Sequence, residues 1–424
     1  MFLFHRAFEN KIISSSSTKP YLILFYGDLC FPCFHIEPIW QKIINELEPI
    51  GVQFATVHAQ HEFNLARKVG LQSLPHIISV VDGQFKSYKE VHISLSKVIE
   101  FIRNSMPSSE SLIPKVNDKN YEQFLSDWQT DNRIRGLFIN EEHFIKLRYL
   151  MIAFEFRDRI AFGHVTLDND SDKIIRRYHV DSKLNSLLIF NEDITRTTAT
   201  LSLVDLKPQL MRDVLEANKF LILPRLASQQ MFEQLCPTET VGSRRRLCIV
   251  LVTNNIKKHD DAREDMRQFI RENQFSKERF RFMYLFEEKQ TEFVKALTIG
   301  HNISQQILGV IVIWRREQDR VLYEWLGNKW DVEDRIKFNE TKQELSSLLT
   351  KLIQANEKFS HDAHVVPLID EHASGLVGRI VKKILLMTDS FSDNLTRKEI
   401  LPIVSVVISI AFIVLIGYSM AHLV

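Results

Sequence analysis

The feature that most constrains the fold of this chain is a pair of cysteines separated by two residues, Cys30-Phe31-Pro32-Cys33. The pair follows the apolar run 21–26, which is typical of a buried strand, and it precedes a predicted helix. This order places Cys30 at the N-terminal end of the helix. The positive end of the helix dipole favours thiolate over thiol there, so it lowers the pKa of the thiol and makes the sulfur reactive.

Downstream of the pair, the pattern predicts a strand, a helix and a further strand, at 52–58, 61–69 and 77–81. With the cysteine pair, this order resembles the thioredoxin family over residues 19–103. The resemblance implies that Gly70 to Pro75 is the cis-proline loop of that family and that Pro75 faces the two sulfurs. Cis X-Pro bonds are uncommon in folded chains, so the assignment of Pro75 comes from the resemblance and not from propensity.

The chain departs from catalytic thioredoxins at two positions. Catalytic members carry a buried carboxylate six residues before the first cysteine, where this chain has Leu24, and a Trp just before that cysteine, where it has Leu29. Asp28 adds a negative charge near the thiols, which raises a thiol pKa. Two hypotheses stay open: a dithiol that exchanges with substrates, and a pair that folds well and reacts slowly.

Length and charge set the wider frame. A chain of 424 residues is long enough for roughly three domains of ordinary size. Its formal net charge of +1 gives no reason to expect nucleic acid as a partner, and no motif indicates a cofactor.

An internal repeat indicates how the domains are arranged. Residues 113–116 (Ile-Pro-Lys-Val) and residues 223–226 (Leu-Pro-Arg-Leu) are 110 positions apart, and each precedes an amphipathic helix. A period near 110 residues is about one thioredoxin-like unit, so it predicts tandem domains.

We therefore predict an α/β fold of tandem thioredoxin-like domains, one with the Cys-x-x-Cys pair and two without, followed by a C-terminal transmembrane helix. The predicted segments are an N-terminal piece with part of a first strand (1–18), the thioredoxin domain (19–106), a redox-inert domain (107–220), a third domain (221–356), a linker with an amphipathic juxtamembrane helix (357–399) and the transmembrane helix (400–424).

The middle domain resembles the non-catalytic units of the protein disulfide isomerase family. Its loop at the active-site position is Asn140-Glu141-Glu142-His143, which has no cysteine, and its cis-proline position falls near Asn185. The apolar spacing predicts a long helix over 141–157 directly after that loop.

The other two cysteines, Cys236 and Cys248, leave two interpretations open. In an oxidising lumen they form a disulfide that closes a loop of about 13 residues and contributes roughly 3 kcal/mol. In a reducing cytosol they are two buried thiols.

Two histidine pairs are spaced three residues apart, His58 with His61 and His361 with His364. Neither pair has a further Cys, His or carboxylate at a sequence spacing that specifies zinc, so we predict no metal site. The acidic residues near the second pair predict a polar linker.

Residues 400–424 form the second strong pattern, 25 residues without a charged side chain. At 1.5 Å per residue this length spans the hydrocarbon core of a bilayer, so the lipid bilayer is a predicted partner. Arg397 and Lys398 on its N-terminal flank predict a tail anchor with a cytosolic N-terminal part; a missing upstream signal peptide would instead make that part lumenal. Candidate glycosylation sites, close in number to chance, are Asn169, Asn302, Asn339 and Asn394.

Over nearly its whole length the chain resembles a family of membrane-anchored J-proteins that contain a thioredoxin domain. The resemblance is carried by Cys-Phe-x-Cys followed by residues 35–38 (His-Ile-Glu-Pro), by residues 235–237 (Leu-Cys-Pro) and by the terminal span. It implies a location in the endoplasmic-reticulum membrane and a role in limiting autophagosome size. The His-Pro-Asp triplet through which a J-domain stimulates Hsp70 does not occur in the sequence, so Hsp70 is not an expected partner; we expect a shorter isoform or an incomplete version of the longer protein.

Two functions follow from these observations. The first is a membrane-tethered binding or scaffold protein of the endoplasmic reticulum. The second is a membrane-bound thiol–disulfide oxidoreductase, in which Cys30 attacks a substrate disulfide, Cys33 resolves the mixed disulfide and Pro75 presents the substrate backbone.

Overall fold

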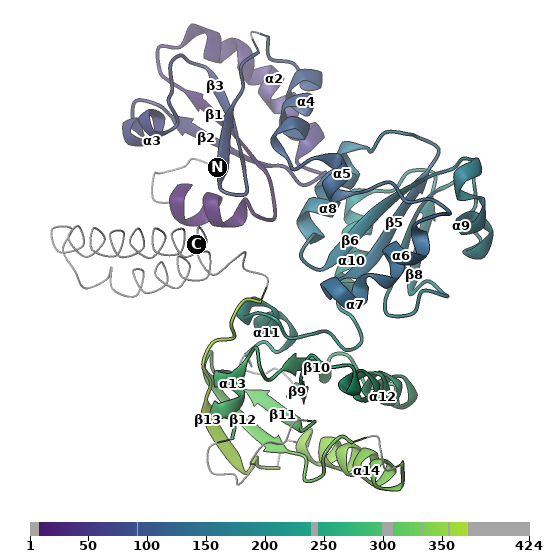
Figure 1. The fold of residues 1–424 in the computed structure, drawn as a ribbon. Coiled ribbons are helices and arrows are strands. Elements are labelled where there is room, and N and C mark those ends of the chain that lie inside the picture. The colour runs from purple at the N-terminus through teal and green to yellow at the C-terminus, as the bar shows by residue number, and fades with distance from the viewer. Residues whose placement is uncertain are drawn as a thin grey trace, which may run out of the picture. The chain divides into compact units, whose positions relative to one another are not determined.

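The computed structural model of the protein describes residues 8–90, 92–238, 245–298, 308–331, 335–354 and 357–371. The chain divides into two compact units, residues 1–224 and residues 225–424 (Figure 1). Within the described ranges, two four-stranded sheets belong to the first unit and one five-stranded sheet belongs to the second.

The predicted transmembrane helix at 400–424 lies outside the described residues, as do the predicted amphipathic helix within 357–399 and the candidate sites Asn302 and Asn394. Among the helices that are described, none combines the length and the apolar character needed to cross a bilayer.

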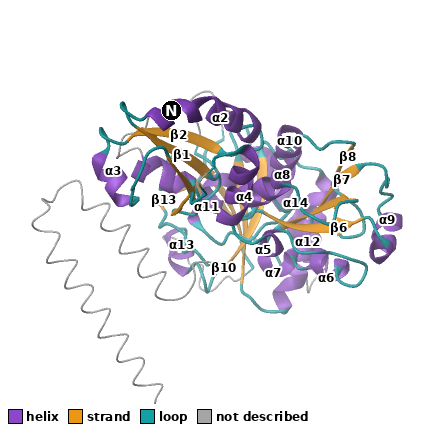
Figure 2. Cartoon of the chain, turned by 90° about the horizontal axis from the view of Figure 1, so that it is seen from above, coloured by secondary structure: helices purple, strands orange, loops and turns teal. Residues whose placement is uncertain are grey.

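The first sheet has the strand order β2-β1-β3-β4, with β1 parallel to β2 and antiparallel to β3. Helices cover both of its faces, and Figure 2 shows them flanking the strands. The elements of this domain are β1 (Tyr21–Tyr26), α2 (Phe31–Leu47), β2 (Gln53–His58), α3 (Phe63–Lys68), β3 (His76–Val81), β4 (Gln84–Ser87) and α4 (Leu95–Ser105).

Helix α2 packs on the sheet through one apolar stripe. Ile36, Trp40, Ile43 and Leu47 recur every three or four residues and are all buried, in the same core as β1 and α4. Pro32 lies in the first turn of the helix, where the missing backbone N–H disrupts no helical hydrogen bond. The apolar stripe therefore fixes the orientation of the helix that begins at the cysteine pair.

The prediction of a partial first strand in residues 1–18 is wrong for the described part, because residues Phe8–Ile13 form a helix, η1. Phe8 and Ile12 are four residues apart, so they lie on one face of that helix. Both are buried against Ile23 and Phe25, on the face of the sheet opposite α2. The apolar spacing of this segment suits a helix that covers the sheet, not a strand that extends it.

The second sheet repeats the pattern of the first, with the order β6-β5-β7-β8, β5 parallel to β6 and antiparallel to β7. Its elements are α5 (Ser109–Leu112), α6 (Tyr121–Ser126), α7 (Trp128–Asp131), β5 (Ile134–Asn140), α8 (Leu147–Phe156), β6 (Ile160–Thr166), η2 (Asn169–Ser171), α9 (Asp172–Arg177), β7 (Asn185–Phe190), β8 (Ala199–Leu203) and α10 (Pro208–Asn218).

Helix α8 is shorter than the predicted helix over 141–157, because it begins only at Leu147. Residues 141–146 are mostly polar and offer few side chains to the core. From Leu147 to Phe156 almost every side chain is buried, since α8 contributes to a core cluster that includes side chains of both the first and the second domain.

Polar contacts reinforce this shared core of the first unit. The Arg212 guanidinium donates from Nε to Glu155 Oε2 (2.8 Å) and from Nη2 to the backbone oxygen of Ile50 (2.8 Å). Arg157 pairs with Asp82 across the same two domains, with 2.9 Å from Nη1 to Oδ2. Charged groups of the second domain thus bind backbone and side-chain oxygens of the first.

The third sheet belongs to the second unit and has the order β10-β9-β11-β12-β13. Its first four strands repeat the directions of the other two sheets. The elements are α11 (Gln229–Leu235), β9 (Leu247–Thr253), α12 (Lys258–Asn273), β10 (Phe280–Phe286), α13 (Thr291–Ala296), β11 (Val310–Arg315), β12 (Arg320–Trp325), α14 (Arg335–Leu352) and β13 (His361–His364).

The internal repeat takes the same position in both domains that contain it. Each segment makes a single parallel bridge to the edge strand of its sheet, Lys115 to His164 and Arg225 to Tyr284. The repeated Pro segments are therefore entry points of the chain into each domain and not full strands.

The predicted polar linker from residue 357 is wrong for residues 357–371. Residues His361–His364 form β13, which pairs antiparallel with β12. Arg320 and Asp362 make an ion pair across the two strands, and the side chains of Val365 and Leu368 are buried. The third domain therefore extends at least to residue 371.

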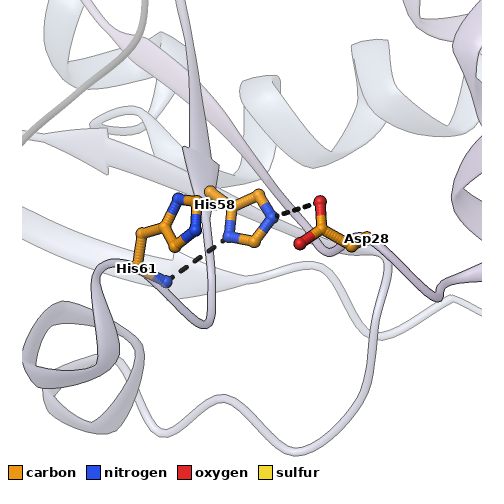
Figure 3. Close-up of side chains that lie close together, drawn as sticks. All are labelled: Asp28, His58 and His61. Carbon is orange, nitrogen blue, oxygen red and sulfur yellow. Dashed lines mark hydrogen bonds and ion pairs between the residues drawn. The ribbon is translucent and has the colours of Figure 1, made fainter.

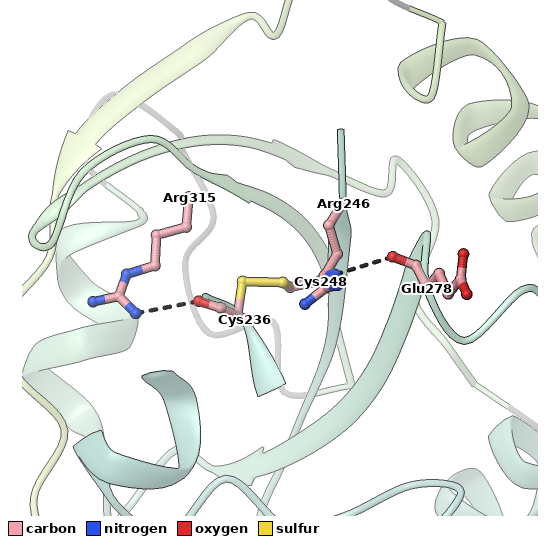
Figure 4. Close-up of a disulfide and its surroundings, with 5 residues drawn as sticks. All are labelled: Cys236, Arg246, Cys248, Glu278 and Arg315. Carbon is pink, nitrogen blue, oxygen red and sulfur yellow. Dashed lines mark hydrogen bonds between the residues drawn. A yellow bond between two sulfur atoms is a disulfide. The ribbon is translucent and has the colours of Figure 1, made fainter. Parts of the chain in front are cut away.

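A disulfide joins Cys236, at the C-terminal end of α11, to Cys248 in β9 (Figure 4). Both residues are buried, and their Cα atoms are 5.9 Å apart. Arg315 Nη1 donates to the Cys236 backbone oxygen (3.2 Å), which anchors the same end of α11 to β11. Of the two interpretations that the sequence left open for this pair, the structure shows the disulfide.

Replacing both Cys236 and Cys248 by alanine is expected to lower the free energy of unfolding of the second unit by about 3 kcal/mol, because the open chain regains the entropy of a loop of about 13 residues. Urea unfolding of the oxidised full chain measures this change. The reduced wild-type protein serves as the control and should match the variant. Equal unfolding midpoints for the oxidised wild type and the variant would contradict the stabilising role of the disulfide.

Candidate functional site

The two cysteines of the first domain lie where β1 ends and α2 begins. Cys30 is the N-cap residue of α2, and its sulfur accepts a hydrogen bond from the Cys33 N–H at 3.2 Å. A disulfide joins the two residues, whose Cα atoms are 5.2 Å apart. Cys30 is only 8% exposed, whereas Cys33 is half-buried. The N–H contact and the helix dipole both favour a thiolate at Cys30 after reduction.

Pro75 lies in the loop between α3 and β3, and the Leu74–Pro75 peptide bond is cis. Pro75 and Pro32 line one groove of about 900 Å³, so the proline loop adjoins the first turn of α2. The other side chains of the groove are mostly polar or small, among them His35, His76 and Ser87. The fold therefore brings the two predicted parts of the site together.

Large apolar side chains surround the cysteine pair and point to solvent. Leu29 is 98% exposed, Phe31 is 73% exposed and Phe34 is 69% exposed. We call these three residues the apolar rim. Single exposed apolar residues are common on proteins, but three within six consecutive positions beside the Cys30–Cys33 disulfide suit contact with another apolar surface.

Leu24 occupies the position of the buried carboxylate of catalytic thioredoxins. It is 3% exposed and packs in the same core cluster as Ile36 and Trp40 of α2. A hydrocarbon side chain accepts no proton, so proton transfer during disulfide exchange has to use solvent or another group. The domain thus keeps the sulfurs of the redox site and lacks one of its acid–base groups.

Asp28, His58 and His61 form a polar cluster next to this site (Figure 3). His58 Nε2 donates to Asp28 Oδ1 at 3.0 Å, and the rings of His58 and His61 stack with centroids 3.9 Å apart. Sequence spacing did not reveal this group, because Asp28 is 30 positions from His58. The available signal was the parallel pairing of two adjacent strands, which places Tyr26 opposite His58.

The corresponding loop of the second domain follows β5 and holds no cysteine. Asn140, the last residue of β5, is buried, and its Oδ1 accepts a hydrogen bond from His164 Nε2 at 2.9 Å. Burial lowers the pKa of His164, and the nearby charges of Lys115 and His143 lower it further. Asn185 begins β7, where the first domain has its proline loop before β3. This loop is a packed polar junction without redox groups.

Two candidate glycosylation sites lie among the described residues. Asn169 is exposed at the start of η2, and Ser171 of the same motif is buried, with its hydroxyl donating to the Thr166 backbone oxygen. Asn339 is exposed on α14.

Comparisons with known proteins agree with this architecture. Three family models match: thioredoxin over residues 2–104, "DJC16, Thioredoxin-like domain 2" over 115–218 and "DJC16, Thioredoxin-like domain 3" over 225–360. They confirm the prediction of tandem thioredoxin-like domains with the cysteine pair in the first.

Individual relatives give the same assignment. DnaJ homolog subfamily C member 16 of Gallus gallus is 31% identical over 410 residues, which is 95% of this chain and 51% of that protein. The human protein of the same name is 30% identical over 414 residues, 96% of this chain and 51% of its own length. A thioredoxin of Borreliella burgdorferi is 35% identical over 79 residues, 18% of this chain and 67% of its own. The chain spans about half the length of the DnaJ homologues that it matches.

The pH dependence of stability is expected to report on His164. Its folded pKa lies below the ordinary value of 6.5, so the unfolded chain binds a proton more readily. The full contribution to stability is therefore present above about pH 6.5 and is lost as the pH falls toward the folded pKa. The melting temperature of the first unit should fall less between pH 7.5 and pH 5.5 for His164→Gln than for wild type. An equal dependence of the melting temperature on pH in the two proteins would contradict this role of His164.

Proposed function

Because the chain belongs, through its thioredoxin-like domains, to the family of DnaJ homolog subfamily C member 16, we propose that it is a membrane-anchored polypeptide-binding protein of the endoplasmic reticulum. Its first domain binds partner polypeptides at the face that carries Cys30, Cys33 and Pro75. The observation that supports this proposal most directly is the apolar rim beside the Cys30–Cys33 disulfide.

The apolar rim supplies the free energy of binding. Burying a Leu or Phe side chain contributes about 1.5–3 kcal/mol, so three such residues provide several kcal/mol even when a partner covers them only in part. Binding of this kind is non-directional and tolerates many partner sequences. It suits a protein that holds unfolded or extended segments.

The groove beside Pro75 supplies the directional part of binding. Its volume of about 900 Å³ is sufficient for a short extended segment of a partner chain. His76 and Ser87 lie in it, held to each other by a contact of 3.2 Å between Nε2 and Oγ. Burial lowers the pKa of His76, which favours the neutral form of this side chain in the groove, and Lys89 and Glu90 add charged groups to the lining.

Leu24 favours binding over rapid turnover. Leu24 packs in a hydrocarbon core, and its own side chain supplies no carboxylate to move protons between the sulfurs. Mixed disulfides with a partner would then form and resolve slowly. The cysteine pair would hold covalently a partner that the apolar rim already binds.

Thiol–disulfide oxidoreduction is the second candidate function, favoured by the hydrogen bond from the Cys33 N–H to the Cys30 sulfur. In the dithiol form, the Cys30 thiolate attacks a substrate disulfide and releases one substrate thiolate. Cys33, as thiolate, then attacks the Cys30 sulfur, which releases the second substrate thiolate and leaves Cys30 and Cys33 as a disulfide.

We place the folded domains in the lumen of the endoplasmic reticulum, anchored by residues 400–424. The buried disulfide between Cys236 and Cys248 supports an oxidising compartment, since such bonds persist there and are rare in the cytosol. Family resemblance extends this proposal to a role in limiting autophagosome size, in which partners held by the first domain are kept at the membrane.

Binding of a permanently unfolded polypeptide tests the proposal. Reduced, carboxymethylated α-lactalbumin has no thiol or disulfide left, so fluorescence anisotropy of a labelled sample measures binding without exchange. The variant Phe31→Ser/Phe34→Ser is expected to weaken binding roughly tenfold or more, since 1.4 kcal/mol corresponds to a factor of ten. Val204→Ser is the matched control, because Val204 is 77% exposed in the second domain; it should bind like wild type.

Equal affinity of the rim variant and wild type would overturn the binding role of the apolar rim. Reduction of insulin in a parallel assay separates the second candidate. If wild type reduces insulin as fast as a thioredoxin assayed beside it, the protein is an oxidoreductase and Leu24 does not limit it. In that case Cys33→Ala should also accumulate mixed disulfides through Cys30.

Glycosylation of Asn169 tests the lumenal location. Asn169 is exposed on η2, so it is accessible to a sugar when its domain is in the lumen. The full chain expressed in cells should lose mass on treatment with endoglycosidase H, and Asn169→Gln should lose less. A wild-type chain that carries no sugar at any of its four motifs would place the domains on the cytosolic side.

A further inference from the structure

Asp28, His58 and His61 lie at one edge of the first sheet and come from three separate segments. His58 is the last residue of β2, Asp28 lies in the loop after β1, and His61 lies in the turn before α3. Because β1 and β2 are parallel neighbours, their carboxyl ends meet at the same edge. Asp28 and His61 are exposed, and His58 is partly buried. The cluster is therefore open to solvent on one side and supported by the sheet on the other.

We propose that Asp28, His58 and His61 form a binding site for a divalent transition metal ion of the zinc class. Each residue offers one ligand atom, and the three atoms lie within 4.8 Å of one another. In the part of the chain that the structure describes, this is the one group of three or more His, Cys, Asp or Glu side chains that meets this condition. Two imidazoles and one carboxylate are the protein ligands of many zinc sites that keep a fourth position for water.

The donor types favour zinc and its neighbours over calcium or magnesium. Imidazole nitrogen suits Zn²⁺, Cu²⁺ and Ni²⁺, whereas Ca²⁺ and Mg²⁺ prefer oxygen ligands throughout. Donors bound to one tetrahedral zinc ion at about 2.0–2.2 Å are roughly 3.3–3.6 Å apart. Here the three ligand atoms lie within 4.8 Å of one another, and His58 Nε2 lies 3.0 Å from Asp28 Oδ1, so rotation of the exposed side chains of Asp28 and His61 is enough to bring all three donors to one ion.

The hydrogen bonds of His58 show how an ion enters. The His61 backbone N–H donates to His58 Nδ1 at 3.4 Å, so the proton of the neutral ring is on Nε2, which donates to Asp28 Oδ1. A cation bound at Nε2 takes the place of this proton, and the proton moves to Nδ1. The long bond from His61 is then released, which frees the turn to bring the His61 ring to the ion.

The second histidine pair provides a comparison within the same chain. His364 Nδ1 lies 3.1 Å from Asp319 Oδ2, so a histidine and a carboxylate meet there as well. His361 and His364 lie three positions apart on β13, so their side chains leave opposite faces of the strand. His364 and Asp319 thus form a pair of neighbouring ligand residues, whereas the first cluster has three. This pair is a matched control for adventitious binding to exposed histidine.

Zinc binding to the oxidised full chain in detergent tests the proposal. All four cysteines of the chain are held in the two disulfides, so no thiolate competes for the ion. Calorimetric titration with ZnCl₂ is expected to find one tight equivalent in wild type. His61→Gln and Asp28→Asn should each weaken zinc affinity by roughly tenfold or more. Loss of a residue that only hydrogen-bonds to a metal ligand already weakens metal affinity by about tenfold, and these variants remove a ligand itself. His361→Gln/His364→Gln should leave it unchanged.

Co²⁺ provides a second measurement that does not depend on any variant. Binding of Co²⁺ to the wild-type site should give the intense visible absorption of four-coordinate cobalt with nitrogen and oxygen donors, and equimolar Zn²⁺ should remove it. The proposal is overturned if wild type has no tight zinc equivalent. It is also overturned if that equivalent persists in both cluster variants, or disappears in the control variant.

Discussion

The parallel pairing of β1 with β2 is the interaction on which the chemistry of the first domain depends. It brings the carboxyl ends of two strands together, with Cys30 and Asp28 after β1 and with His58 and His61 around the end of β2. The apolar stripe of α2 then fixes the helix whose N-terminus holds the cysteine pair. Without this pairing the same residues would be distant in space, since 28 positions separate Cys30 from His58.

Three domains use one sheet topology and differ in the loop that follows its central strand. In the first domain this loop holds a disulfide with an apolar rim. In the second it has no cysteine and follows Asn140, the last residue of β5, which is buried and bonded to His164. The third domain has a disulfide in a different place, between α11 and β9, where it stabilises the entry of the chain into the sheet. Among the three domains, the first therefore has redox groups after its central strand, whereas the second has packed polar side chains at the same position.

Much of the fold could be predicted from the sequence because the strands are short apolar runs bounded by turn residues. The cysteine pair could be placed at a helix N-terminus for the same reason, whereas the role of Pro75 came from family resemblance. Features that depend on tertiary contacts could not be predicted. The segment 361–364 is mostly polar, and it forms an edge strand through its antiparallel pairing with β12, which the ion pair to Arg320 supports.

The polar cluster was missed for a related reason. Metal-ligand motifs are recognised by short spacings, and Asp28, the carboxylate that accompanies His58 and His61, follows another strand. The start of α8 was predicted too early because Phe144 continues the apolar spacing of the helix, although its side chain is exposed. Spacing alone does not distinguish an apolar residue that faces solvent from one that faces a core.

The core that the first and second domains share has a mechanical consequence. A force applied through the second domain reaches the cysteine pair through packed side chains and through the Arg212 contacts, not through a flexible tether. A polypeptide bound beside Cys30 would therefore be held by two domains that move together, and a force on the second domain would also rotate the bound segment.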